Sequence, residues 1–268
     1  MNAHEHDQLR QQVRDAYGAV ARAGSSACCA PSTGCCAPSD QAVAELLARG
    51  IGYSAEETAA VPEGANLGLG CGNPQAIAAL KPGETVLDLG SGAGFDAFLA
   101  AGQVGASGSV IGVDMTPDMV SRARANAANG GYVNVDFRLG EIEHLPVADA
   151  TVDVIISNCV INLSPDKAQV FRDAFRVLKP GGRLAISDIV ISAPLPPDMQ
   201  RDVALYTACV AGAASVDELA EMLAETGFAD IRIAPRDASR EFIRHWAPGR
   251  GIEDYIASAT IEAIKPAN

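Results

Sequence analysis

Cysteine is the residue type in this chain whose spacing most directly suggests chemistry. Of seven cysteines, four fall within nine positions as the adjacent pairs Cys28–Cys29 and Cys35–Cys36. Thiolates bind soft and borderline metals and metalloids, so this Gly-, Ser- and Pro-rich segment is predicted to capture a soft ion. Zinc remains a rival ligand, although CC-x5-CC is not a familiar zinc-finger spacing. A surface loop with incidental cysteines is the simplest alternative.

The other three cysteines stand in different settings. Cys71 lies between glycines in NLGLGCGNP, where missing side chains let a thiol approach a ligand. Cys159 directly follows the apolar run VDVIIS, and Cys209 is expected on a later helix, in YTACVAGA. A small buried apolar residue is the alternative for Cys159, and for Cys209 taken alone it is the favoured one.

The glycine-rich stretch VLDLGSGAGF predicts a cofactor loop. A buried strand with Asp88 leads into Gly90, Gly92 and Gly94, and a helix follows whose N-terminus offers free N–H groups. About 20 residues on, the strand SVIGVD ends in Asp114, an acid suited to a ribose diol. A nicotinamide site is disfavoured, because GSGAG does not match GxGxxG and Asp88 would repel a pyrophosphate.

Strands and helices alternate along most of the chain, which predicts a doubly wound, parallel α/β sheet. The expected strands are a first one at Val86–Leu87, then Ser109–Asp114, Val133–Phe137, Val152–Ser157, Arg183–Val190, Ile231–Ile233 and Ala257–Ile264. The expected helices include Gln41–Gly50, Pro117–Asn129, Asp166–Leu178, Asp198–Ala211 and Val216–Thr226, with Leu9, Val13, Ala16, Tyr17 and Val20 on one face of an earlier helix. In such sheets ligands bind beyond the carboxyl ends of the strands, so Cys159 is expected to face the glycine loop.

The composition of the chain limits the classes of partner that it can bind. A net charge of −13 argues against a nucleic-acid backbone as the main partner, and no apolar run approaches the roughly 20 residues of a membrane span. The polar start MNAHEHDQLR carries no signal segment, so a cytoplasmic protein with reduced thiols is expected.

Several longer motifs make a resemblance specific. LGCGNP, ISNCVINLSPDK, RVLKPGGRL and YTACVAGA, together with VLDLGSGAG, IGVDMT and GEIEHLP, resemble the arsenite S-adenosylmethionine methyltransferases. The resemblance implies a Rossmann-like class I methyltransferase with a mostly parallel seven-stranded sheet. Expected segments are an N-terminal helix and cysteine-rich arm (1–72), a cofactor-binding core (73–192), and helices completing the arsenic site plus the last two strands (193–268).

The same resemblance implies the site residues. Cys71, Cys159 and Cys209 would bind trivalent arsenic, with Cys35 and Cys36, or Cys28 and Cys29, as candidates for a further thiol. S-adenosylmethionine would be held by Asp88, Gly90, Ser91, Gly92, Gly94, Asp114, Met115, Glu141, Ile142 and Asn158. Arsenite or methylarsenite would be the substrate, and thioredoxin or glutathione the reductant. The rivals are a class I methyltransferase acting on a small organic nucleophile and a thiol-rich metalloid-binding protein without catalysis.

Overall fold

The computed structural model describes residues 3–23 and 40–267. Within these ranges the strands are β1 (Thr85–Leu89), β2 (Ser109–Asp114), β3 (Val135–Leu139), β4 (Val152–Asn158), β5 (Leu178–Ile191), β6 (Ala214–Ser215), β7 (Ala229–Arg236) and β8 (Ile256–Ile264). The helices are α1 (Ala3–Ala23), α2 (Asp40–Gly50), α3 (Ala55–Ala59), α4 (Gln75–Ala78), α5 (Phe95–Val104), α6 (Pro117–Gly130), α7 (Lys167–Val177), α8 (Pro197–Gln200), α9 (Val203–Thr207), α10 (Val216–Thr226) and α11 (Arg240–Ile243). Short 3-10 turns lie at Ile161–Leu163, Asp237–Ser239 and Ile252–Asp254.

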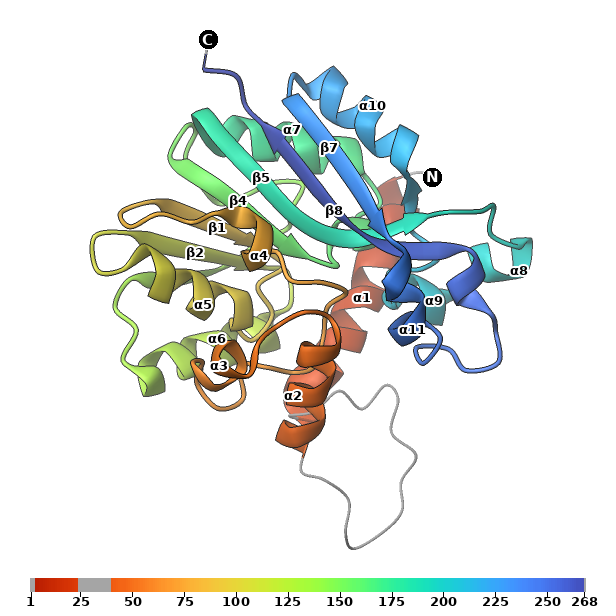
Figure 1. Ribbon diagram of the computed structural model, residues 1–268, viewed down its shortest axis with the longest axis horizontal. Helices are drawn as coiled ribbons and strands as arrows, with labels where there is room; N and C mark the ends of the chain where they lie inside the picture. The colour runs from red at the N-terminus through yellow and green to blue at the C-terminus, as the bar shows by residue number, and fades with distance from the viewer. Residues whose placement is uncertain (1–2, 24–39, 268) are drawn as a thin grey trace, which may run out of the picture.

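The strands form one sheet in the order β3-β2-β1-β4-β5-β8-β7 (Figure 1). The first five of these pair in parallel, β8 pairs antiparallel with β5 and β7, and the two-residue β6 adds to β5. The predicted doubly wound, mostly parallel sheet is therefore confirmed, with β6 as a minor addition.

Alternation along the strands divides the core between the two faces of the sheet. Val86 on β1 and Val154 on β4 pack with apolar residues of α5 and α6, whereas Leu87 and Ile155 pack with those of α7 and α10. Because helices cover both faces of the sheet, most side chains of the central strands β1 and β4 are apolar, with Asp88 and Asp153 among the exceptions.

A third apolar cluster lies beyond the carboxyl ends of β4 and β5. It joins Cys71, Cys159 and Cys209 to residues of α1, α8, α9, α11 and β8. Figure 1 shows α9 and α11 gathered at this end of β8, with α1 beside them. The cysteines are thus collected by the segments that cap one end of the sheet.

Three local predictions were wrong. The expected helix Asp198–Ala211 is two short helices, α8 and α9. Cys209 lies after the second of them with φ 62°, a backbone value that ends a helix. The fifth strand, expected at Arg183–Val190, already begins at Leu178 and contains an irregularity, where pairing jumps from Leu178 to Arg183 while β4 advances from Val152 to Val154. The third strand begins at Val135 and leaves Val133 exposed.

Candidate active site

The glycine loop turns the chain sharply between β1 and α5. Gly90, Gly92 and Gly94 all have positive φ, and the N–H groups of Gly90 and Ser91 donate to the Val113 carbonyl at the end of β2. A Cβ on Gly94 would lie 2.6 Å from the Phe98 ring, but one on Gly92 would meet nothing within 4 Å. Gly92 therefore presents backbone to open space, where a ligand can lie against it.

Three acidic side chains, Asp88, Asp96 and Asp114, lie around this loop, and the first two are buried. Asp88 is 2% exposed, and its Oδ2 has no hydrogen-bond partner. Burial, then the charges of Asp96 and Asp114, raise the pKa of Asp88 well above its ordinary value. A cationic group placed here would gain from all three carboxylates. The ammonium and sulfonium of S-adenosylmethionine fit this requirement, and a pyrophosphate does not.

Asp114 ties the loop to the second strand. Its Oδ2 accepts the Gly92 N–H at 2.9 Å, and its Oδ1 accepts the Thr116 N–H at 2.8 Å. Each carboxylate oxygen has capacity for a second donor, so a ribose hydroxyl can still bind there. Its role towards the ribose stays a prediction, and the structure adds that Asp114 holds the loop in shape.

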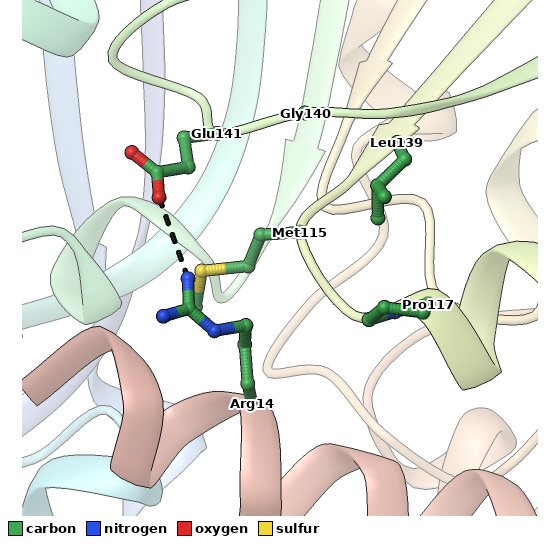
Figure 2. Close-up of a pocket in the computed structure, with 6 residues that line it drawn as sticks. All are labelled: Arg14, Met115, Pro117, Leu139, Gly140 and Glu141. Carbon is green, nitrogen blue, oxygen red and sulfur yellow. Dashed lines mark hydrogen bonds and ion pairs between the residues drawn. The ribbon is translucent and has the colours of Figure 1, made fainter. Parts of the chain in front are cut away.

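A cavity of about 280 Å³ opens next to Asp114, lined by Arg14, Met115, Pro117, Leu139, Gly140 and Glu141 (Figure 2). Met115 and Glu141 thus lie together where an adenine was expected. Figure 2 shows Arg14 of α1 reaching to Glu141, with Nη1 and Oε1 3.4 Å apart. Ile142 is buried in the core beside β1 and α7 instead of lining the cavity.

The three cysteines of the capping segments converge as free thiols. The sulfur atoms of Cys71 and Cys159 and a carboxylate oxygen of Asp188 lie within 4.8 Å of one another. The Cys209 Sγ–H donates to the Cys159 carbonyl at 2.8 Å, and the Cys71 Sγ–H donates to the Ser187 carbonyl at 3.6 Å. All three are buried. The structure therefore brings together the three thiols that the resemblance grouped.

Backbone strain accompanies this convergence. Cys159 has φ 60° and Cys209 has φ 62°, values that L-residues rarely adopt. Holding a side chain there costs about 1–3 kcal/mol, so the surrounding packing must impose it. Such strain is common where side chains are aimed at a ligand.

The thiols are protonated at neutral pH. Burial raises the pKa of Cys71 to about 11. The hydrogen bond with Cys159, then burial, raise the pKa of Cys209. For Cys159, the hydrogen bond with Cys209 lowers the pKa, but its bond with Cys71 and burial outweigh this, so the pKa is also raised. The site holds neutral thiols until a ligand displaces their protons.

Asn158 and Asp188 have contacts that the sequence did not reveal. Asn158, whose role towards the cofactor stays a prediction, hydrogen-bonds to the backbone on both sides of the Cys71–Gly72 peptide. Asp188 lies on β5, one residue past the last residue that pairs with β4, and accepts hydrogen bonds from Ile161, Asn162 and its neighbour Ile189. Burial raises the pKa of Asp188 to about 6.

Sequence reasoning missed four polar residues around the site: Arg10, Arg14, Tyr53 and Asp96. Asp96, two residues after Gly94, carried a signal, since an acid in the first turn of the loop helix sits near any bound cofactor. Tyr53 and the two arginines come from segments distant in sequence, and nothing near them marked their placement. Cys28, Cys29, Cys35 and Cys36 lie outside the described residues.

A family model described as a methyltransferase domain matches residues 80–227. Together with the sheet order, the glycine loop and the acidic cluster, this match defines an S-adenosylmethionine-dependent class I methyltransferase. More narrowly, the chain belongs to the arsenite methyltransferase family. It is 54% identical over 264 residues to an arsenite methyltransferase of Halobacterium salinarum, across 97% of this chain and 68% of that protein.

Two further comparisons agree with this family assignment. An arsenite methyltransferase of Aquipseudomonas alcaligenes is 46% identical over 171 residues, covering 61% of this chain and 49% of that protein. The crystal structure of an arsenic(III) S-adenosylmethionine methyltransferase from Chlamydomonas reinhardtii aligns with TM-score 0.60 and 33% identity, over 83% of this chain and 73% of that one. The aligned part of the chain spans 68% of the Halobacterium salinarum protein and 49% of the Aquipseudomonas alcaligenes protein. Among the helices described here, none has the length and apolar character needed to cross a bilayer.

Proposed function

We propose that this protein transfers the methyl group of S-adenosylmethionine to trivalent arsenic held by Cys71, Cys159 and Cys209. The observation that carries the proposal is the meeting of three buried thiols at the end of the sheet that also bears the glycine loop. Trivalent arsenic accepts up to three sulfur ligands in a pyramid and keeps a lone pair. Arsenite, methylarsenite or both are the substrates that fit this site.

Binding of arsenite at the three thiols is balanced in charge. Arsenous acid and three thiols react to give a tris-thiolate complex and three water molecules, so each thiol proton leaves with an arsenic-bound hydroxide. Both the reactants and the complex are neutral. A buried, apolar site whose cysteine pKa values are raised suits this exchange, because no net charge is taken out of water.

When bound, S-adenosylmethionine supplies an electrophilic methyl group on a sulfonium. Asp88, with Asp96 and Asp114 nearby, provides the negative charge for the cationic end of this molecule. Gly90, Ser91, Gly92 and Gly94 form the loop against which it would lie, and Asn158 would line the same crevice through its contact with Asp96. Met115 and Glu141, beside Ile142, would surround the adenine, and Asp114 would accept from the ribose.

The chain contributes mainly orientation of the two reactants. The arsenic lone pair forms the new As–C bond while the methyl–sulfur bond breaks, so no proton is removed and no general base is needed. Fixing both reactants near the attack geometry can lower the barrier by roughly 7–11 kcal/mol. The strained backbones of Cys159 and Cys209 serve this orientation.

Methylation oxidises the arsenic by two electrons. Two cysteine thiols can return these electrons by forming a disulfide, and an external dithiol or thiol then reduces the disulfide. Thioredoxin or glutathione is the reductant we propose. Free thiols persist in a reducing compartment, so we place the reaction in the cytoplasm.

Methyl transfer from labelled S-adenosylmethionine to arsenite and to methylarsenite tests the proposal. The wild-type protein is compared with Cys71→Ser, Cys159→Ser and Cys209→Ser, in the presence of thiol. Activity that disappears in Cys159→Ser and Cys209→Ser supports thiolate-bound arsenic as the nucleophile. Cofactor binding without transfer to either arsenical would instead favour a small organic substrate, and arsenite binding without transfer would favour a metalloid-binding protein.

A further inference from the structure

Asn158 connects the two halves of the site. Its Oδ1 accepts the Cys71 N–H at 3.0 Å, and its Nδ2 donates to the Gly72 carbonyl at 2.8 Å. The same Nδ2 lies 3.4 Å from Asp96 Oδ2 and 3.0 Å from the Tyr53 hydroxyl. One amide side chain therefore touches both the arsenic-ligand segment and the first turn of the helix that follows the glycine loop.

Asp96 is the end of this connection that faces the cofactor loop. It is buried, and its Oδ1 accepts the Tyr53 O–H at 2.7 Å and a weaker contact from Gln75 at 3.4 Å. Its charge also acts on Asp88, which shares the same acidic cluster. A cation arriving beside Asp88 consequently changes the field at Asp96 and at the amide that contacts it.

The backbone next to Cys71 packs closely against the Asn158 side chain. A Cβ added to Gly70 would lie 2.8 Å from Asn158 Nδ2, so the backbone before Cys71 passes directly against this amide. The other restraint on the Cys71 backbone is Ser258, whose hydroxyl donates to the Cys71 carbonyl at 2.6 Å. Ser258 comes from β8 and is not among the partners of Asp96.

We propose that Asn158 is a positioning residue that links the cofactor pocket to Cys71, so that occupancy of one site tightens the other. The inference rests on the proposed function and adds that cofactor binding and arsenic binding influence each other. Coupling between two binding sites is reciprocal. Cofactor binding should therefore restrain Cys71, and arsenic bound through Cys71 should raise the affinity for the cofactor.

Alkylation of single cysteines, followed by mass spectrometry, measures the restraint directly. The reduced protein is treated with N-ethylmaleimide, with and without saturating S-adenosylhomocysteine, and labelling rates are taken for Cys71 and Cys209. We expect the nucleoside to slow labelling of Cys71 by about fivefold or more, the lower end of ordinary coupling between sites. Cys209, which has no contact with Asn158, should change much less.

Two variants of Asn158 separate its acceptor contact from its donor contacts. Asn158→Asp keeps an acceptor for the Cys71 N–H, but it loses the donor to the Gly72 carbonyl, the Tyr53 hydroxyl and Asp96. Asn158→Ala removes all four contacts. Protection of Cys71 by S-adenosylhomocysteine should be lost in both, while unprotected labelling should become faster in both and more so in Asn158→Ala.

Ser258→Ala is the matched control, because it loosens the same peptide from the other side. Labelling of Cys71 should become faster in this variant and should still be slowed by S-adenosylhomocysteine. Retained protection in the Asn158 variants, or no protection in the wild-type protein, would overturn the inference. Absence of protection in the wild-type protein overturns the inference even if a variant fails to fold.

Calorimetry with S-adenosylhomocysteine keeps this outcome distinct from failure of the proposed function. If the wild-type protein binds the nucleoside but Cys71 labelling does not respond, the link through Asn158 is wrong and the methyltransferase proposal stands. If the wild-type protein does not bind it, the proposed function itself fails.

Discussion

An ion pair to a buried carboxylate is one of the contacts that hold α1 against the rest of the protein. Arg10 on α1 donates to Glu143 Oε1 from Nη2 at 3.0 Å and from Nε at 3.3 Å, and the Glu143 side chain is only 4% exposed. The Ser164 hydroxyl donates to the same oxygen at 2.7 Å. Because α1 also carries Arg14 into the cavity beside Met115, this ion pair supports a wall of the proposed cofactor site.

Arg10→Met keeps the apolar stem of the side chain and removes its charge. Orphaning a fully enclosed charge costs roughly 3–5 kcal/mol. Ser164 still donates to Glu143, so we expect the smaller loss of a charged hydrogen bond, about 1.5–3 kcal/mol. Arg14→Met is the matched control, since its partner Glu141 is 35% exposed and such pairs contribute about 0–1 kcal/mol.

Urea unfolding of both variants, together with hydrogen exchange over residues 3–23, measures this difference. Arg10→Met should lower the free energy of unfolding and the protection of α1 clearly more than Arg14→Met. Equal effects of the two substitutions would refute the argument that the burial of Glu143 sets the cost.

Three further predictions concern the site itself. Asp114→Ala should weaken S-adenosylhomocysteine binding by about tenfold or more in calorimetry, because the charge-assisted bonds to the Gly92 N–H of the loop and to the Thr116 N–H are lost. Asp114→Asn should lose less, and unchanged affinity in both variants would remove Asp114 from the site. Burial raises the pKa of the Cys71 thiol from 9.0 to about 11, so the thiol form stabilises the fold below pH 9. This contribution is lost as the pH rises towards 11. The urea midpoint of unfolding should therefore fall less over that range in Cys71→Ser than in the wild-type protein. Arsenite binding near pH 7 should release no net protons, and calorimetric enthalpies that depend on the ionisation heat of the buffer would contradict the neutral exchange.

Sequence motifs predicted the core of the fold because their physical requirements are local. A buried strand, a glycine turn and a helix start occupy adjacent residues, so VLDLGSGAGF could be interpreted without its surroundings. Apolar runs such as VDVIIS likewise indicated parallel strands covered on both faces. The irregular segment around Cys209 was harder, since helix propensity favours a continuous helix and only tertiary packing imposes φ 62° there.

By itself, the sequence determined the strand–helix alternation, the glycine loop between two acid-bearing strands, and the family to which the cysteine motifs belong. The resemblance grouped Cys71, Cys159 and Cys209, and the tertiary structure shows how they meet. The tertiary structure alone decided that Asn158 holds the Cys71 peptide and that α1 supplies Arg10 and Arg14 to the other side of the site. These contacts join residues far apart along the chain. Once the sheet and its capping segments have packed, each buried polar group needs a hydrogen-bond partner, and these contacts form between the groups that packing brings together. No local sequence pattern encodes which groups those are.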